Sequence, residues 1–275
     1  MNRFEFRLRG TEAGFRKLIE RIPLQDNPPL PRDWLRCEML ERLLVLRNAG
    51  VASNSVALEV GSGGHAISTV PLAYLLGPNG RVLAAERQRW DQFRAVVAAS
   101  GMVERVSPVR CDARRLPLRD DTVDLAVCIH GIRSLRGEDQ MVSVFREMLR
   151  VAPRVFLAES LPIAKTRAQR AHLAMYNLRE EVFHATTGRR DDLHYLPLEQ
   201  LTALVERAGG AVKDSRVLDV DLPHALAYFP RSLVEAIPAV VRRDSLLRRW
   251  DAASAMLAQH GEDHPPVGMI WASRP

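Results

Sequence analysis

The amino-acid sequence predicts an α/β fold in which helices cover a mostly parallel β-sheet. Apolar runs of strand length alternate along the chain with amphipathic stretches of helix length. The first apolar run ends in a glycine-rich turn, where a strand can lead sharply into a helix. The 275 residues, 47% hydrophobic and 26% charged, can bury a sizeable core as one large domain or two small ones. This composition excludes a disordered chain.

Seven segments, most of them apolar, have the length of β-strands, and the third is the weakest of them. The fourth is nearly all apolar, as expected of a strand that is covered on both faces. The predicted strands are Val56–Val60, Arg81–Glu86, Arg105–Arg110, Val123–Ile129, Arg154–Ala158, Ala211–Val220 and Val267–Ser273.

Helical spacing of apolar residues predicts a helix before the first strand and one in most of the connections. Pro71 predicts an early stop or a kink in the second helix, and Pro238 a break in the last. The predicted helices are Asp33–Arg47, His65–Leu76, Arg89–Ala99, Asp139–Val151, Pro162–His184, Leu198–Ala208 and Arg231–His260.

The domain organisation follows from these elements. A proline-rich linker precedes the first helix, so residues 1–50 are interpreted as an N-terminal extension with a helix. Residues 51–275 form the main domain, with a helical insertion at about 222–264.

Arginine dominates the positive charge of the chain. The net charge is 39 − 33 = +6, and lysine occurs only as Lys17, Lys165 and Lys213, so the other 36 basic residues are arginine. Arginine binds phosphate well, which leaves nucleic acid open as a partner. The charges are scattered, however, and this favours an ion-paired, solvated surface.

Cysteine usage and hydropathy bear on the location of the protein. Cys37, Cys111 and Cys128 are widely spaced and form no CxxC or Cys/His pattern, so neither a disulfide framework nor a metal site is predicted. The first 17 residues lack the apolar segment of a signal peptide, and no apolar run is long enough to span a membrane. We therefore expect a cytoplasmic protein with no membrane association.

The glycine-rich turn and a later acid suggest a nucleotide-like ligand. The first strand leads into Glu59-Val60-Gly61-Ser62-Gly63-Gly64-His65, where glycine lets a ligand approach the backbone. Glu86 ends the second strand, 25 residues beyond Gly61, where a carboxylate can accept hydrogen bonds from ribose hydroxyls. Dinucleotide enzymes share this acid, so it does not identify the cofactor.

A third motif gives the chain its family resemblance. After the third strand comes Cys111-Asp112-Ala113-Arg114-Arg115-Leu116-Pro117-Leu118-Arg119-Asp120-Asp121-Thr122-Val123-Asp124. With the two preceding motifs, this run resembles the class I S-adenosylmethionine-dependent methyltransferases, type 11 group, over about residues 35–220. The resemblance implies a Rossmann-like fold whose seven-stranded, mostly parallel sheet has an antiparallel last strand. The family's third turn glycine is displaced here, since His65 stands in its place.

The resemblance also implies the cofactor, S-adenosylmethionine, and its binding residues. Glu59 would orient the turn or the cofactor's amino group, and Glu86 would hold the ribose hydroxyls. Asp112 would accept the adenine amino hydrogen. The remaining cofactor-binding residues that the resemblance implies are Gly61, Ser62, Gly63, Arg87, Ala113, Cys128 and Ile129.

Catalytic and acceptor residues are less constrained. His130 follows the fourth strand at the edge where the methyl group would be transferred, so it is the candidate general base. Acceptor specificity in this family usually resides in the N-terminal extension and the segment after the fifth strand. The candidate acceptor residues there are His172, Tyr176, His194 and Tyr195.

These observations predict an S-adenosylmethionine-dependent methyltransferase that acts on a small-molecule acceptor. Two alternatives remain open: an RNA methyltransferase, suggested by the arginine content, and a non-catalytic cofactor-binding sensor or assembly subunit, suggested by the displaced glycine. A nicotinamide dehydrogenase is a more distant alternative. The sequence specifies neither the methylated atom nor the oligomeric state.

Overall fold

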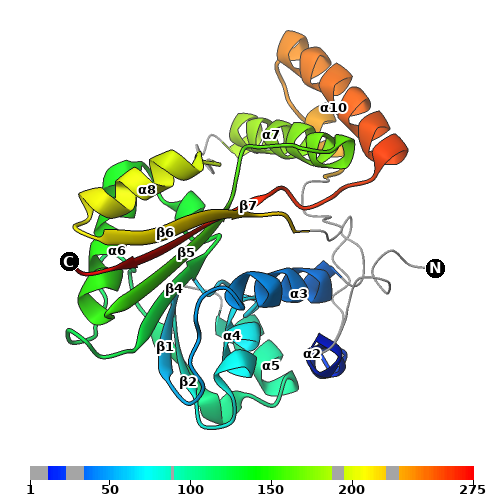
Figure 1. Cartoon of the computed structure of the whole chain (residues 1–275). Helices are drawn as coiled ribbons and strands as arrows, with labels where there is room; N and C mark the ends of the chain where they lie inside the picture. Colours follow the sequence, from blue (N-terminus) through cyan, green and yellow to red (C-terminus); the bar gives the residue numbers. More distant parts are fainter. Residues whose placement is uncertain (1–11, 23–33, 88–89, 188–194, 221–228) are drawn as a thin grey trace.

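A computed structural model describes residues 12–22, 34–87, 90–187, 195–220 and 229–275 (Figure 1). The strands are β1 (Val56–Val60), β2 (Arg81–Glu86), β3 (Val106–Arg110), β4 (Leu125–Ile129), β5 (Arg154–Ser160), β6 (Ala211–Leu218) and β7 (Val267–Ser273). The helices are α2 (Glu12–Ile19), α3 (Trp34–Leu46), α4 (Thr69–Leu76), α5 (Trp90–Ala99), α6 (Glu138–Val151), α7 (Arg167–Thr187), α8 (Leu198–Arg207), α9 (Ser232–Glu235) and α10 (Val240–His260), with the 3-10 turns η1 (Val103–Arg105) and η2 (Ile132–Ser134).

The seven strands form one sheet in the order β3-β2-β1-β4-β5-β7-β6. Neighbouring strands from β3 to β5 are parallel, while β7 runs antiparallel to both β5 and β6. The chain moves outward in one direction from β1 and in the other from β4, so the order reverses between these two strands. In open α/β sheets, ligands bind at such a reversal, beyond the carboxyl ends of the strands. The predicted fold class is confirmed.

Helices bury both faces of the sheet, which explains why the central strands are so apolar. Alternate strand residues such as Ala57 and Val127 pack with α2, α3, α4 and α5 in one core cluster. Their neighbours, such as Leu58 and Cys128, pack with α6 and α8 in a second cluster on the other face. The N-terminal helices α2 and α3 thus share a core with the sheet (Figure 1).

The helices inserted between β6 and β7 pack mainly on α7 rather than on the sheet. Buried residues of α7, α9 and α10 form a third core cluster, which includes Met175, Val234 and Leu246. Figure 1 shows α7 and α10 side by side above the sheet. The layer formed by α7, α9 and α10 therefore has its own core, separate from the core clusters on the two faces of the sheet.

Two helix starts differ from the sequence prediction for local reasons. The predicted helix at His65 begins at Thr69, because Gly63 and Ala66 adopt positive φ angles of 65° and 50°, outside the right-handed helical region. Pro71 then lies in the first turn, where its missing N–H costs no helical hydrogen bond, so neither the stop nor the kink occurs. The break at Pro238 is found, between α9 and α10.

The helix predicted from Pro162 begins instead at Arg167. Thr166 accepts a hydrogen bond from the Gln169 N–H at 3.1 Å through its hydroxyl oxygen, and Gln169 Oε1 accepts from the Thr166 N–H at 3.2 Å. This reciprocal capping box fixes the N-terminus of α7. Within the described residues, no helix combines the length and apolar character needed to cross a bilayer.

Candidate functional site

Two glycines, Gly61 and Gly131, allow the turn after β1 and the turn after β4 to approach each other closely. These turns lie where the strand order of the sheet changes direction. Gly61 has a φ of 76°, a conformation that suits glycine. A Cβ atom on Gly61 would lie 3.4 Å from the Gly131 Cα atom, and one on Gly131 would lie 2.8 Å from Cys128 Sγ and 3.1 Å from the Val60 carbonyl oxygen. The absence of side chains at these positions keeps backbone exposed between the two turns.

Glu86 joins the glycine-rich turn to the end of β2. Its Oε2 atom accepts a hydrogen bond from the Gly63 N–H at 3.1 Å, and its Oε1 atom accepts one from the Arg87 N–H at 2.6 Å. The Gly61 N–H also donates to the Ala85 carbonyl at 3.0 Å. The turn and the acid therefore form one hydrogen-bonded unit, and the carboxylate orientation is set by backbone groups.

Asp112 lies at the end of β3 beside Arg114. The guanidinium of Arg114 donates to both carboxylate oxygens of Asp112, and the Arg114 backbone N–H donates to Oδ1 at 3.0 Å. Hydrogen bonding from the Arg114 side chain lowers the pKa of Asp112 to about 2. The Asp112 side chain is 37% exposed, so this ionised carboxylate can also meet a ligand.

The loop that follows Asp112 is fixed to α6 by two charged side chains. Arg150 donates to the carbonyl oxygens of Leu116 at 3.1 Å and Leu118 at 2.8 Å, and it pairs with Glu147 at 2.8 Å. Glu147 in turn accepts the Leu116 N–H at 2.7 Å. These bonds satisfy the loop backbone and hold the segment after β3 against the sheet.

A cavity of about 450 Å³ lies at this sheet edge. Six of the ten residues predicted for cofactor binding line it, and these are Gly61, Glu86, Arg87, Asp112, Ala113 and Cys128. Its volume is within the usual range of roughly 300–1,000 Å³ for small-molecule and cofactor sites. Residues from the ends of four strands, β1 to β4, therefore share one concave surface.

The other four predicted cofactor residues lie behind this surface or beside it. Gly63 contacts Glu86 as described above, and Ile129 is buried in the core cluster that contains α2–α5. Ser62 is 5% exposed, and its Oγ atom has no hydrogen-bond partner among the described residues. A buried hydroxyl without a partner is a group that a polar ligand can satisfy.

Glu59 is buried in β1, 2% exposed, and accepts a hydrogen bond from the Thr69 hydroxyl. Burial raises the pKa of Glu59 to about 7, although the bond from Thr69 opposes the shift. Burial likewise raises the pKa of Glu159, at the end of β5, to about 7. Two carboxyl groups near the sheet edge thus titrate close to neutrality.

These raised pKa values predict a loss of stability between about pH 4.5 and 7. In that window the folded protein binds more protons than the unfolded chain, whose glutamates ionise near 4.5, so the free energy of unfolding decreases as pH rises and then levels off. Glu59→Gln should remove about half of this decrease, since Glu159 supplies a similar share. Urea unfolding at a series of pH values measures the slope. If Glu59→Gln leaves the dependence of unfolding free energy on pH unchanged, Glu59 is not a source of it. The same conclusion follows if the exposed control Glu206→Gln reduces that dependence equally.

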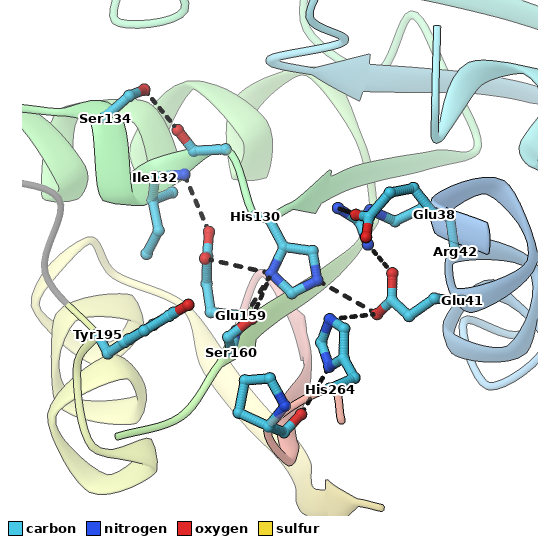
Figure 2. Close-up of polar contacts among 12 residues, drawn as sticks. Glu38, Glu41, Arg42, His130, Ile132, Ser134, Glu159, Ser160, Tyr195 and His264 are labelled. Carbon is cyan, nitrogen blue, oxygen red and sulfur yellow. Dashed lines mark hydrogen bonds and ion pairs between the residues drawn. The ribbon is translucent and has the colours of Figure 1, made fainter. Parts of the chain in front are cut away.

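His130 does not line the cavity and lies in a buried polar cluster next to it (Figure 2). Its backbone has a positive φ of 52°, and its Nε2 atom lies 3.3 Å from Glu41 Oε1 on α3. Its Nδ1 atom accepts a hydrogen bond from the Ser160 N–H at 3.1 Å. His264, which precedes β7, approaches the same oxygen, with 3.7 Å between its Nε2 atom and Glu41 Oε1. Both ring nitrogens of His130 are thus engaged by protein groups.

Three of the four predicted acceptor residues come together at α7. The His172 ring stacks on Tyr176 with 5.9 Å between centroids, and the Tyr176 and Tyr195 centroids are 4.5 Å apart. His172 Nδ1 lies 2.7 Å from Glu262, and its Nε2 lies 3.3 Å from the Tyr195 hydroxyl. This group lies outside the cavity lining. His194 lies outside the described residues.

Sequence reasoning missed several residues of this region. The segment after β4 supplies a second wall of the cavity, formed by Gly131, Ile132, Ser134, Leu135 and Arg136. Gly131, two residues beyond the end of the predicted fourth strand, was the available signal. Glu41, Glu159 and His264 had none, because they come from distant parts of the chain and meet only in the folded protein.

Comparison with known proteins agrees with the fold. The family model for the methyltransferase domain of the type 11 group matches residues 58–154, which run from β1 to β5. Together with the matches to individual relatives, this model supports a class I S-adenosylmethionine-dependent methyltransferase of the type 11 group, with S-adenosylmethionine as its cofactor.

Individual relatives are distant. A ubiquinone/menaquinone biosynthesis C-methyltransferase UbiE from Idiomarina loihiensis is 24% identical over 172 residues, which are 58% of this chain and 68% of that protein. The structure of a cyclopropane-fatty-acyl-phospholipid synthase-like protein from Lactobacillus casei has a TM-score of 0.70 at 15% identity, and the match covers 96% of this chain and all of that one. A SAM-dependent methyltransferase from Aquifex aeolicus has a TM-score of 0.50 at 20% identity over 77% of this chain and 94% of that one.

Proposed function

We propose that this methyltransferase transfers the methyl group to a small-molecule acceptor at the sheet edge between β1 and β4. The observation that carries the proposal is the cavity of about 450 Å³ in which Gly61, Glu86 and Asp112 meet. S-adenosylmethionine supplies an activated methyl group, so the protein's main tasks are to orient the reactants and exclude water.

Residues that line the cavity, and others directly beside it, have distinct roles in this proposal. Glu86, held by two backbone N–H groups, keeps lone pairs for the ribose hydroxyls. Asp112, kept ionised by Arg114, accepts from the adenine amino group, and the Ala113 N–H donates to the ring. The backbone of Gly61–Gly63 and the Ser62 hydroxyl face the methionine portion, while Glu59 stabilises the turn from behind.

A small acceptor is supported over RNA by the distribution of arginine. Many of the arginines in the described part of the chain pair with acids at the surface, including Arg207 with Glu138, Arg231 with Asp251 and Arg249 with Glu181. Such pairing leaves less positive charge for phosphate contacts. The UbiE relatives, named for ubiquinone and menaquinone biosynthesis, also favour a small ring compound methylated at carbon.

Transfer of labelled methyl groups tests the proposal. The purified protein is incubated with S-adenosylmethionine labelled in its methyl group and with cell extract separated into small-molecule, lipid, RNA and protein fractions. Label is expected in the small-molecule or lipid fraction and should resist ribonuclease. Label confined to the RNA fraction would support the RNA alternative, and cofactor binding without any labelled product would support the sensor.

A further inference from the structure

Three buried side chains from separate parts of the chain direct ligand-type atoms at one another. Glu41 comes from α3, His130 from the turn after β4 and His264 from the segment before β7. Glu41 Oε1 lies 3.3 Å from His130 Nε2 and 3.7 Å from His264 Nε2, and the three donor atoms all lie within 4.8 Å of one another (Figure 2). The side chains are 2–3% exposed.

Each of these side chains also has an outer partner. His264 Nδ1 donates to the Pro265 carbonyl oxygen at 2.6 Å, which places the ring proton there and leaves a lone pair on Nε2, facing Glu41. Glu41 Oε2 pairs with Arg42. His130 Nδ1 lies 3.2 Å from Ser160 Oγ and 3.7 Å from Glu159 Oε2. Outer partners of this kind orient ligands in metal sites.

The net charge of the groups around Glu41, His130 and His264 favours a bound cation. The carboxylates of Glu38, Glu41 and Glu159 share two guanidiniums, those of Arg42 and Arg133. One negative charge remains when all five groups are ionised, which requires a pH above the raised pKa of Glu159, about 7.

We propose that Glu41, His130 and His264 form a binding site for a divalent transition metal ion, with zinc as the best-suited ion. Two imidazoles and one carboxylate are a donor set that zinc accepts, at bond lengths of about 2.0–2.2 Å. Ligand atoms around a tetrahedral ion are then about 3.4 Å apart, close to the 3.3 Å and 3.7 Å found for Glu41 and the two rings. Three protein ligands leave a fourth position for water or another ligand.

The hydrogen bond from the Ser160 N–H to His130 Nδ1 shows how the metal-free protein fills this site. It places the His130 proton on Nε2, where that proton meets Glu41. A metal ion replaces this proton at Nε2. That proton moves to Nδ1, where Ser160 Oγ and Glu159 Oε2 are the acceptors, and the Ser160 N–H then gives up its bond to the ring. Bound metal therefore ties α3 and the segment before β7 to the carboxyl end of β4.

Metal titration of the chelator-treated, tag-free chain tests the proposal. We expect one zinc ion to remain per chain after dialysis, and we expect thermal unfolding to shift to higher temperature with added zinc, because the ion binds the folded state. Cobalt(II) should bind competitively and give the visible absorption of an imidazole-ligated, four-coordinate ion. This spectrum needs no variant, so it remains informative if a substituted protein fails to fold.

Matched variants locate the ion. Glu41→Gln, which preserves the side-chain shape, and His264→Ala should each weaken zinc binding at least tenfold and abolish the thermal shift. His260→Ala, at the end of α10, removes a histidine outside the cluster and should leave binding unchanged. Binding below one ion per chain in the unsubstituted protein, or equal affinity in Glu41→Gln and His264→Ala, would overturn the proposal.

Discussion

Replacement of Glu86 by alanine is expected to weaken the binding of S-adenosylhomocysteine by roughly ten- to a hundredfold. The carboxylate is fixed by the N–H groups of Gly63 and Arg87 at the rim of the cavity, so it is preorganised to accept ribose hydroxyls. Hydrogen bonds to charged groups contribute about 1.5–3 kcal/mol each, and the substitution also frees the turn. Isothermal titration calorimetry with the unsubstituted protein and the variant measures the change.

Two further variants show whether the loss of affinity comes from the charge of Glu86, from its hydrogen-bond acceptors, or from the removal of any acid. Glu86→Gln keeps an acceptor oxygen but loses the charge, so its affinity should lie between those of the unsubstituted protein and Glu86→Ala. Glu104→Ala removes an exposed acid on η1, away from the cavity, and should bind as the unsubstituted protein does. Equal affinity in all four proteins would remove Glu86 from the cofactor site.

Gly131→Ala is expected to reduce both stability and cofactor binding. The backbone at Gly131 has a φ of −93°, which alanine tolerates, so the effect is steric. The added methyl group would lie 2.8 Å from Cys128 Sγ and 3.1 Å from the Val60 carbonyl oxygen. Overpacking of this kind costs about 1–3 kcal/mol of unfolding free energy. Urea unfolding and calorimetry measure the two losses.

A double variant tests the steric explanation of the Gly131 effect. In Gly131→Ala/Cys128→Ala, the Cys128 sulfur is removed while the contact with the Val60 backbone remains. Compared with Cys128→Ala alone, the added cost of Gly131→Ala should fall by more than half. If the cost of Gly131→Ala is the same in both backgrounds, the contact with the sulfur is not its cause.

The strands and several residues that line the cavity could be predicted from the sequence because their signals are local. Strand-length segments, most of them apolar, located all seven strands within two residues at each end, and Gly61, Glu86 and Asp112 lie at or just beyond strand ends, where the parallel sheet gathers them. The start of α7 was also encoded locally, in the capping box of Thr166 and Gln169, but apolar periodicity alone did not reveal it.

The surroundings of His130 could not be predicted in this way. Glu41 precedes it by 89 residues, and His264 follows it by more than 130, so no spacing along the chain relates the three. Their contact depends on how α3 and the segment before β7 pack against the sheet. The side chain assigned from sequence as the candidate base is therefore enclosed by partners that only the tertiary structure identifies.

A crystal structure of the complex with S-adenosylhomocysteine tests whether this cavity holds the cofactor. We expect the nucleoside to lie in the cavity at the ends of β1, β2 and β3, with its ribose hydroxyls on Glu86, its adenine amino group on Asp112 and its sulfur near Gly61 and Gly131. A ligand bound elsewhere, with Glu86 and Asp112 turned into solvent and the cavity closed by protein side chains, would contradict it.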